Sequence, residues 1–165
     1  MKYLFFKTNE TWTGTFLRWT LSLVFIPHGL QKTFGLFGGM GFSKTMEVFT
    51  HDLRLPSVVA FTVIMVEFFG SLLLLLGLGT RFWALSFIGL LIGIMLTTHI
   101  ENGFFMNWFG TQKGEGCQFD ILAIGIALAL LFEGAGKLSI DGQIFSRRNN
   151  LTNQPKVEAI DEMDI

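Results

Sequence analysis

Glu67 is a single carboxylate near the middle of a long apolar stretch. From Ser57 to Gly79 there are 23 residues without Lys, Arg or Asp, and Glu67 is the only charged side chain among them. About 20 such residues form a helix that can cross a hydrocarbon core about 30 Å thick. Because a charge is costly in lipid, we expect Glu67 to be protonated, paired with a cation or turned toward water. Gly70 and Ser71 share its helix face, which indicates that this face points into a bundle.

A cation for Glu67 is available on the preceding apolar segment. We predict a helix from Trp12 to Gly29. Its 3.6-residue period, when it is extended to Lys32, places six residues on one stripe: Gly14, Arg18, Ser22, Phe25, Gly29 and Lys32. A guanidinium group suits a buried, bidentate contact with a carboxylate. The sequence therefore predicts a buried ion-pair network of Arg18, Glu67 and Glu133.

A second interpretation of Glu67 is a ligand or proton site, and the residues alone leave both interpretations open. A lipid-soluble ligand needs an apolar slot for its chain and polar groups at its head. Histidine titrates near neutral pH and could relay protons to such a ligand. The candidate ligand-binding residues are His28, Lys32, Glu67 and His99. Because the two histidines are isolated and near helix ends, we predict no metal site.

The pattern of apolar segments predicts an all-α fold, an integral membrane four-helix bundle. The other predicted spans are Phe82 to Thr98 and Gln118 to Ala135. Residues 31–55 are too long and apolar for a plain turn, so we expect an interfacial connection between helices 1 and 2, with a short helix from Ser43 to Leu53. The predicted membrane domain covers residues 1–145, and residues 146–165 form a polar tail that we expect to be disordered.

A pair of glycines in the third predicted span, Gly89 and Gly93, forms a GxxxG motif. This motif suits close helix packing and allows a homo-oligomer. Both Arg81 and the preceding Thr80 lie in the very short connection to the second span, so these two spans must be antiparallel neighbours.

Composition narrows the class of protein. The chain has 165 residues, of which 50% are hydrophobic and 15% aromatic, including 19 Phe. This is too apolar for an ordinary soluble domain and makes the lipid bilayer the expected surroundings. The net charge of −1, without a basic cluster, argues against nucleic acid as a partner. The single cysteine, Cys117, excludes an intrachain disulfide.

The distribution of Lys and Arg predicts the orientation. With four spans both termini lie on one side, and that side collects eight of these residues against four on the other side. The bias favours a multi-pass protein with both termini in the cytoplasm.

Several motifs, in this order, resemble the DoxX family of small four-helix bacterial membrane proteins. They are Arg18 followed by HGLQK (28–32), the run ExxGxLLLLLGLGTR (67–81) and GAGKLSID (134–141). The resemblance implies a plasma-membrane bundle of a family named after a subunit of a thiosulfate:quinone oxidoreductase. It gives weight to eight positions: Arg18, Gly29, Lys32, Glu67, Arg81, Gly134, Gly136 and Asp141. The chain departs from the family pattern at Gln118, Phe119 and Asp120, where many relatives resemble Glu-aromatic-His, and this puts in doubt a role for a second buried acid or histidine.

Two functions are consistent with these observations. The first is a redox-associated membrane subunit that binds a quinone or similar lipid-soluble ligand and works with other membrane redox proteins. The second is a non-catalytic assembly or packing subunit of a membrane complex, in which the predicted ion pairs hold helices together. The residues do not decide whether the protein is an enzyme, because no flavin, haem or iron–sulfur motif is present.

Overall fold

The structure is a computed structural model that describes residues 8–9 and 11–152, with the side chains of 148–152 left out. Its described residues form helices and no strand. In chain order the α-helices are α1 (Trp12–Phe34), α2 (Gly41–Glu47), α3 (Ser57–Met65), α4 (Ser71–Leu76), α5 (Thr80–Ile94), α6 (Gln118–Glu133) and α7 (Ile140–Thr152). Short segments of other helix types lie between them: η1 (Leu36–Gly38) and η5 (Ile100–Asn102) are 3₁₀-helical, and η2 (Val48–Asp52), η3 (Val66–Gly70) and η4 (Met95–His99) are π-helical.

Two continuous helices in the described part of the chain are long and apolar enough to cross a membrane. One runs from Ser57 to Leu76 through α3, η3 and α4, and the other runs from Thr80 to Asn102 through α5, η4 and η5. Helix α6 has 16 residues, which is about 24 Å at 1.5 Å per residue and shorter than a typical hydrocarbon core. The predicted all-α class is confirmed for the described residues, whereas four membrane crossings stay a prediction.

The first helix is longer than the sequence pattern predicted. We expected it to end at Gly29, but α1 continues through Phe34. It ends at Gly35, whose φ of 73° is left-handed and whose N–H donates to the carbonyl of Gln31. A glycine adopts this conformation without the steric cost of a Cβ atom, so the helix ends there. The extra turn carries Lys32 within the helix.

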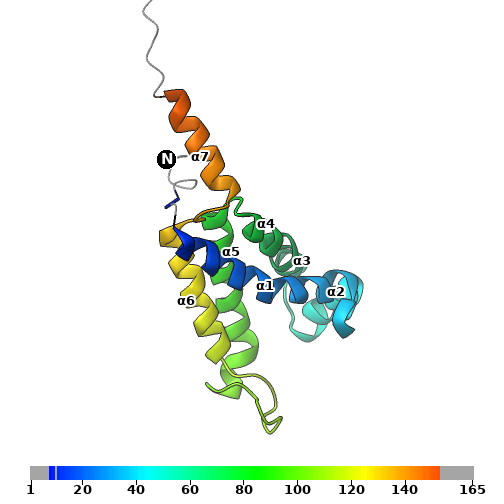
Figure 1. Ribbon diagram of the computed structural model, residues 1–165. Coiled ribbons are helices and arrows are strands. Elements are labelled where there is room, and N and C mark those ends of the chain that lie inside the picture. The colour runs from blue at the N-terminus through cyan, green and yellow to red at the C-terminus, as the bar shows by residue number, and fades with distance from the viewer. Residues whose placement is uncertain (1–7, 10, 153–165) are drawn as a thin grey trace, which may run out of the picture.

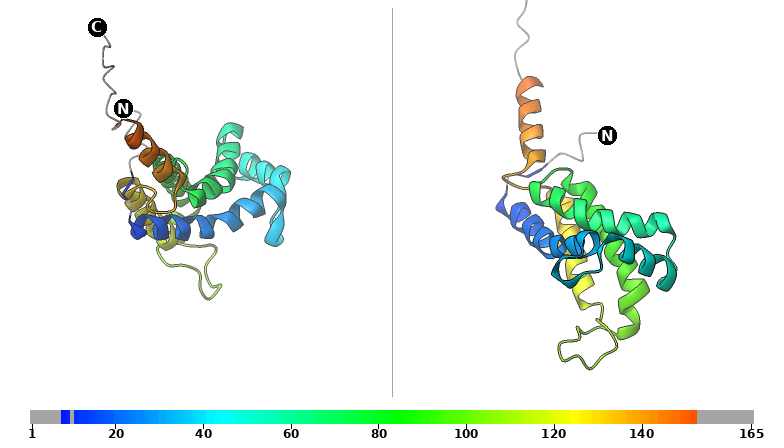
Figure 2. Two further views of the ribbon diagram at one scale, coloured as in Figure 1. Left: turned by 45° about the horizontal axis from the view of Figure 1, so that its top comes forward. Right: turned by 90° about the vertical axis from the view of Figure 1, so that its right-hand side faces the viewer.

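Helices α1, α4, α5 and α6 share one hydrophobic core. Its buried residues come from all four helices: Leu21, Phe25, Leu74, Ala84, Phe87, Leu90, Leu91, Ala123, Ala127 and Leu130. Figures 1 and 2 show α5 and α6 side by side and antiparallel, with α1 crossing them and α2 and α3 displaced to one side. Phe25 and Phe87 meet near the middle of this core with ring centroids 4.9 Å apart. The shared core holds α1 at a fixed angle to α5 and α6.

Arg18 lies at one end of this core and is completely buried. Its Nε donates to the carbonyl of Ala135 at 2.8 Å, and Nη2 donates to the carbonyls of Lys137 at 3.0 Å and Leu138 at 2.6 Å. Its Nη1 donates to the carbonyl of Leu75. A guanidinium offers five N–H donors in a fixed plane, so one side chain can satisfy carbonyls from several segments. Arg18 therefore joins α1, the end of α4 and the segment after α6.

Asp141 completes the same end of the molecule. Its two carboxylate oxygens accept hydrogen bonds from the backbone N–H groups of Gly79 and Thr80, each at 2.8 Å. These groups lie at the start of α5, where N–H groups have no partner within the helix and a negative charge is favourable. The N–H of Asp141 donates to the carbonyl of Gly77 at 2.9 Å. We call Arg18, Asp141 and their backbone partners the end clamp.

The segment after the end clamp differs from the sequence prediction. We expected a disordered tail from Ser146, but α7 is helical from Ile140 to Thr152 and extends away from the other helices. The rest of that prediction, residues 153–165, lies outside the described residues. Ser139 begins this helix by accepting a hydrogen bond from the N–H of Gly142 at 3.1 Å, as an N-terminal cap does.

The end clamp predicts a strong effect of shortening the guanidinium. We expect Arg18→Lys to lower the free energy of unfolding by at least about 3 kcal/mol, because an ammonium cannot reach four carbonyls in one plane and buried carbonyls would lose their partners. The measurement is reversible unfolding of the protein in detergent micelles. Arg147→Lys, at an exposed position, should change the value by less than about 0.5 kcal/mol. Equal effects of the two substitutions would contradict this role.

Candidate functional site

Glu67 lies in the π-helical segment η3, within the continuous apolar helix from Ser57 to Leu76. The residue is almost completely buried. The wider turn of a π-helix is common where a helix carries a functional residue. Helix α1 crosses η3 at Gly29, where an added Cβ would lie 2.6 Å from Cα of Phe68 and 2.8 Å from the carbonyl oxygen of Glu67. Only a glycine allows this approach, so Gly29 sets how closely α1 approaches the acid.

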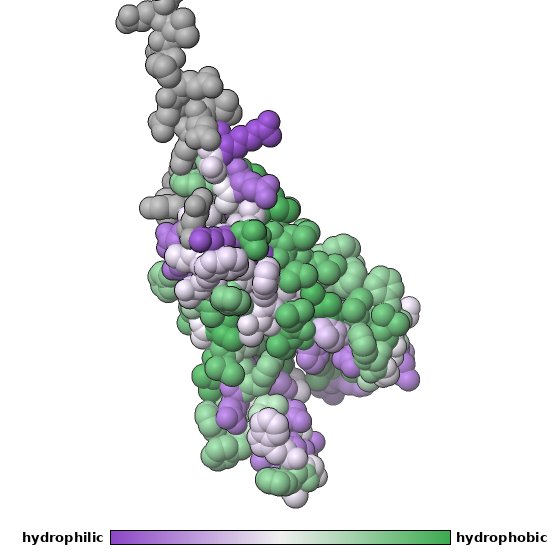
Figure 3. All heavy atoms as spheres, viewed as in Figure 1, coloured by the Kyte–Doolittle hydropathy of each residue, from purple (hydrophilic) through white to green (hydrophobic). Residues whose placement is uncertain are grey.

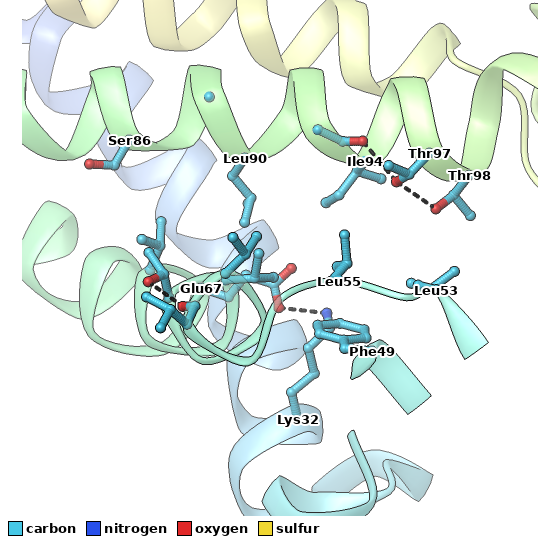
Figure 4. Close-up of a pocket in the computed structure, with 17 residues that line it drawn as sticks. Lys32, Phe49, Leu53, Leu55, Glu67, Ser86, Leu90, Ile94, Thr97 and Thr98 are labelled. Atoms are coloured by element: carbon cyan, nitrogen blue, oxygen red, sulfur yellow. Dashed lines mark hydrogen bonds and ion pairs between the residues drawn. The ribbon is translucent and has the colours of Figure 1, made fainter. Parts of the chain in front are cut away.

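One turn further along α1, Lys32 forms an ion pair with Glu67. The Lys32 Nζ lies 2.5 Å from Oε2 of Glu67, and the lysine side chain is 23% exposed whereas that of the acid is 2% exposed. No other described group donates a hydrogen bond to Oε2. Figure 4 shows the second carboxylate oxygen pointing away from Lys32 into the space between η3 and α5. The carboxylate can therefore accept a hydrogen bond from a bound molecule.

The ion pair lies in the wall of a pocket of about 600 Å³. The pocket lies between the helix that runs from Ser57 to Leu76 and the helix that runs from Thr80 to Asn102. This volume is within the range of about 300 to 1,000 Å³ that is typical of small-molecule sites. The lining is mostly apolar, with hydroxyl groups toward its ends, and consists of Lys32, Phe49, Leu53, Leu55, Val58, Val59, Thr62, Val63, Val66, Glu67, Ser86, Gly89, Leu90, Gly93, Ile94, Thr97 and Thr98. An apolar pocket with one buried, paired charge can bind an amphiphilic molecule and exchange a proton with its polar group.

All three π-helical segments of the described chain contribute to this pocket. Phe49 comes from η2, Glu67 from η3, and Thr97 from η4. Each π turn holds one more residue than an α turn and turns its neighbours to a different face. The irregular helical geometry is therefore concentrated around one cavity, as is common at functional sites.

The predicted contact between Arg18 and Glu67 is wrong. Arg18 donates its hydrogen bonds to the carbonyls of the end clamp, and Lys32 is the cation that reaches Glu67. Arg18 and Lys32 share a stripe of α1 but are 14 residues apart, which is about 21 Å along the axis. The stripe was identified correctly, but its period cannot decide which of two cations lies at the depth of the acid.

Glu133, the third member of the predicted network, also has other partners. Its Oε1 accepts a hydrogen bond from the hydroxyl of Thr11, and its Oε2 accepts one from the side-chain amide of Asn9 at 3.3 Å. These contacts attach the end of α6 to the residues before α1. The network of Arg18, Glu67 and Glu133 is therefore not formed.

The two candidate histidines do not line the pocket. His28 is exposed and lies against Phe25, with ring centroids 5.9 Å apart. His99 forms a contact of 2.6 Å between its Nδ1 and Oδ2 of Asp120. Of the four predicted ligand-binding residues, the structure brings Lys32 and Glu67 together in the pocket and places His28 and His99 outside it.

Asp120 is the buried acid that the sequence interpretation missed. Its side chain is 1% exposed and lies on α6, where we doubted a role for a second acid. The signal was its spacing from small and apolar residues that are also buried, Ala123, Ala127 and Leu130. Positions three, seven and ten residues further on lie on one helix face, which places the acid on the core side. In the described part of the chain no three His, Cys, Asp or Glu side chains gather as metal ligands.

The contact between Lys32 and Glu67 should be visible as energetic coupling. We expect Lys32→Met and Glu67→Gln each to destabilise the protein, and the double substitution to cost less than the two separate effects together by about 1 to 3 kcal/mol. Each single change leaves one buried charge without its partner, whereas the double change removes both charges. A double-mutant cycle of unfolding free energies measures this difference. Additive effects would show that the pair is not formed.

The crossing of α1 and η3 predicts that Gly29→Ala destabilises the protein by about 2 kcal/mol or more, because the new methyl group would clash with backbone atoms. Gly125→Ala is the matched control, since Gly125 is also within a helix but an added Cβ meets nothing within 4 Å. That control should be neutral or stabilise the protein by up to about 1 kcal/mol. Thermal unfolding of both variants tests the difference. A stable Gly29→Ala protein would exclude the close crossing.

Comparison with known proteins identifies a family and a relative that are similar to this chain in sequence. The DoxX family model matches residues 14–100, which include Arg18, Gly29, Lys32 and Glu67. A protein of Bacillus subtilis (strain 168) named "Putative oxidoreductase CatD" is 28% identical over 134 residues, which cover 81% of this chain and 88% of that protein. No solved structure matches this chain. The family model covers more than half of the chain, and this protein therefore belongs to the DoxX family of membrane proteins.

Proposed function

We propose that the protein spans the bacterial plasma membrane with four helical segments, based on α1, α3 to α4, α5 and α6. Two of these segments have the length and composition of membrane spans, and all four share one core. Large apolar side chains also point outward from them, for example Phe16, Val58, Leu85 and Leu122, which are 59%, 77%, 55% and 66% exposed. Figure 3 shows this apolar surface around the middle of the molecule. Such extensive exposure suits lipid rather than water.

The orientation follows from the Lys and Arg count. Eight of these residues lie on the side of the termini and four lie opposite, which favours termini in the cytoplasm. The end clamp would then lie toward the cytoplasmic side, and η4 with His99 would lie toward the opposite side. Helix α6 is short for a span, but a short helix is accommodated by a locally thinner bilayer.

We further propose that the protein is redox-associated and binds a quinone or a similar lipid-soluble ligand in the pocket at Glu67. The observation that carries this proposal is the combination of a mainly apolar pocket of about 600 Å³ with a single buried ion pair in its wall. A relative whose name contains the word oxidoreductase supports the redox role. The polar groups of the described residues at this pocket are hydroxyls, one ammonium and one carboxylate. These groups suit an organic ligand that forms hydrogen bonds.

The chemistry of the two charged groups suits the two forms of a quinone. The Lys32 ammonium can donate a hydrogen bond to a carbonyl oxygen of the oxidised ring. The Glu67 carboxylate can accept a hydrogen bond from a hydroxyl group of the reduced ring and can hold the proton that this group releases. Reduction of a quinone takes up equal numbers of electrons and protons. The residues of the pocket would handle protons, and a partner redox protein would supply or receive the electrons.

The test is binding of a short-chain benzoquinone to the purified protein in lipid nanodiscs. We expect the ligand to raise the Tm of the wild-type protein, because a molecule that binds only the folded state stabilises it. Lys32→Met and Glu67→Gln should lose at least about tenfold in affinity, which is about 1.4 kcal/mol. Lys44→Met and Glu101→Gln alter exposed residues of the same types outside the pocket and should bind normally.

An unchanged Tm for the wild-type protein over a full range of quinone concentrations would contradict this proposal. Folding of Glu67→Gln is checked separately by circular dichroism and gel filtration. If that variant unfolds, the ion pair is first of all a structural contact, as in an assembly subunit, and the Lys32→Met result decides on ligand binding.

A further inference from the structure

The GxxxG motif of α5 faces the pocket instead of another helix. Ser86, Gly89, Gly93 and Thr97 all line the pocket. Their spacing of three, four and four residues places them on one face of the helix. We call these four residues, three from α5 and Thr97 from the adjoining η4, the α5 stripe. An added Cβ at Gly89 or Gly93 would meet nothing within 4 Å. The motif that the sequence assigned to helix packing is therefore open in this chain.

The open stripe contrasts with glycines that do contact a neighbour. A Cβ added at Gly29 would lie 2.6 Å from backbone, and one added at Gly70 would lie 2.9 Å from the ring of Trp83. At those positions the missing side chain allows two elements to meet. At Gly89 and Gly93 the missing side chain instead leaves a channel. The opposite wall consists of apolar residues from the helix that runs from Ser57 to Leu76, namely Val58, Val59, Val63 and Val66.

The channel extends from the buried ion pair along α5. The α5 stripe covers 11 residue steps, which is about 16 Å along the helix axis. Figure 4 shows Ser86 at one end of the view and Thr97 and Thr98 at the other, with Glu67 facing the helix between them. Glu67 is almost completely buried, and one of its carboxylate oxygens is directed into this space. The polar anchor and the apolar channel thus form one site.

We propose that the α5 stripe is the groove for the extended apolar chain of an amphiphilic ligand, whose polar head lies at Lys32 and Glu67. This inference rests on the proposed ligand site and names the part of the ligand that determines its selectivity. A single alkyl or prenyl chain fits the volume of about 600 Å³. The channel meets a buried ion pair at Glu67, which suits a ligand that has a polar head and one apolar chain.

The experiment fills the groove and compares three probes. Gly89→Leu places a side chain in the channel, and Gly125→Leu places the same side chain at an exposed glycine of α6 that also has open space around it. The probes are a benzoquinone with a decyl chain, the same ring without the chain, and decan-1-ol. Binding is measured in nanodiscs by the shift in Tm, and versions of the two chain probes with a photoreactive diazirine at the chain end are mapped by mass spectrometry.

We expect Gly89→Leu to weaken binding of both chain probes by at least about tenfold and to leave the ring without a chain within about twofold. Gly125→Leu should bind all three probes as the wild type does. The diazirine should label residues 86–98 in the wild-type protein. Normal binding of the chain probes by Gly89→Leu, or labelling elsewhere, overturns the groove.

The outcomes separate this inference from the proposed quinone site. If decan-1-ol binds in a manner that depends on Gly89 and neither quinone binds, the groove stands and the quinone proposal fails. If both quinones bind equally with and without the chain and Gly89→Leu has no effect, the quinone site stands and the groove fails. If Gly89→Leu instead converts a dimer into a monomer on gel filtration and leaves chain binding intact, the occupant is a second copy and the groove is overturned.

Discussion

The cost of burying charge determines how this chain folds. Among the described residues, Arg18, Glu67, Asp120 and Asp141 are each at most 2% exposed. Each of them finds its partner on a different element. Arg18 contacts α4 and the segment after α6, Glu67 contacts α1, Asp120 contacts η4 and Asp141 contacts the start of α5. Because an unpaired buried charge costs several times the net gain of a good contact, these pairs fix which elements can be neighbours. The apolar core holds the helices together, and the buried charges determine which helices are neighbours.

The paired charges divide the molecule into two regions with different character. At the end clamp, charged side chains satisfy backbone groups, and glycines such as Gly14 and Gly136 allow the backbones to touch. At the pocket, the helices widen into π turns and glycines of α5 face empty space. Tight backbone packing at one end leaves the other end free to separate, because the helices are already held in place. A cavity that binds a ligand needs such support, because a deformable site loses affinity.

Much of this could be predicted from the sequence, because periodicity reports which face of a helix is buried. The stripe of α1 with Arg18, Gly29 and Lys32 does face the interior, and Glu67 does point inward. Depth along the helix axis was harder: the identity of the cation at Glu67 depends on a crossing point that Gly29 sets through contacts with a distant segment. Asp120 was missed because its partner, His99, comes from another helix. The GxxxG motif looks the same in sequence whether a helix or a cavity lies opposite.

The apolar period of the sequence also did not predict where the helices end. The extension of α1 to Phe34 and the helix α7 up to Thr152 contain polar residues that the apolar period does not register. The three π segments are likewise invisible in composition, since a π turn needs no special residue and arises from tertiary packing. The ligand hypothesis named Lys32 and Glu67 together with two histidines. The structure places the first two residues at one cavity and the two histidines outside it.

The π turn at Glu67 has a consequence for how such a site can arise and be lost. A helix advances about 100° per residue, and a π turn is equivalent to one residue inserted into an α-helix. Deleting a single position between Val66 and Gly70 would restore regular winding and rotate the preceding half of the helix by that angle relative to the following half. The acid and the residues that flank the cavity would then face different neighbours while the hydropathy profile stayed almost the same. Chains of nearly identical composition can thus differ in whether they present a carboxylate to α1, and chain length in this short stretch distinguishes them better than overall identity does.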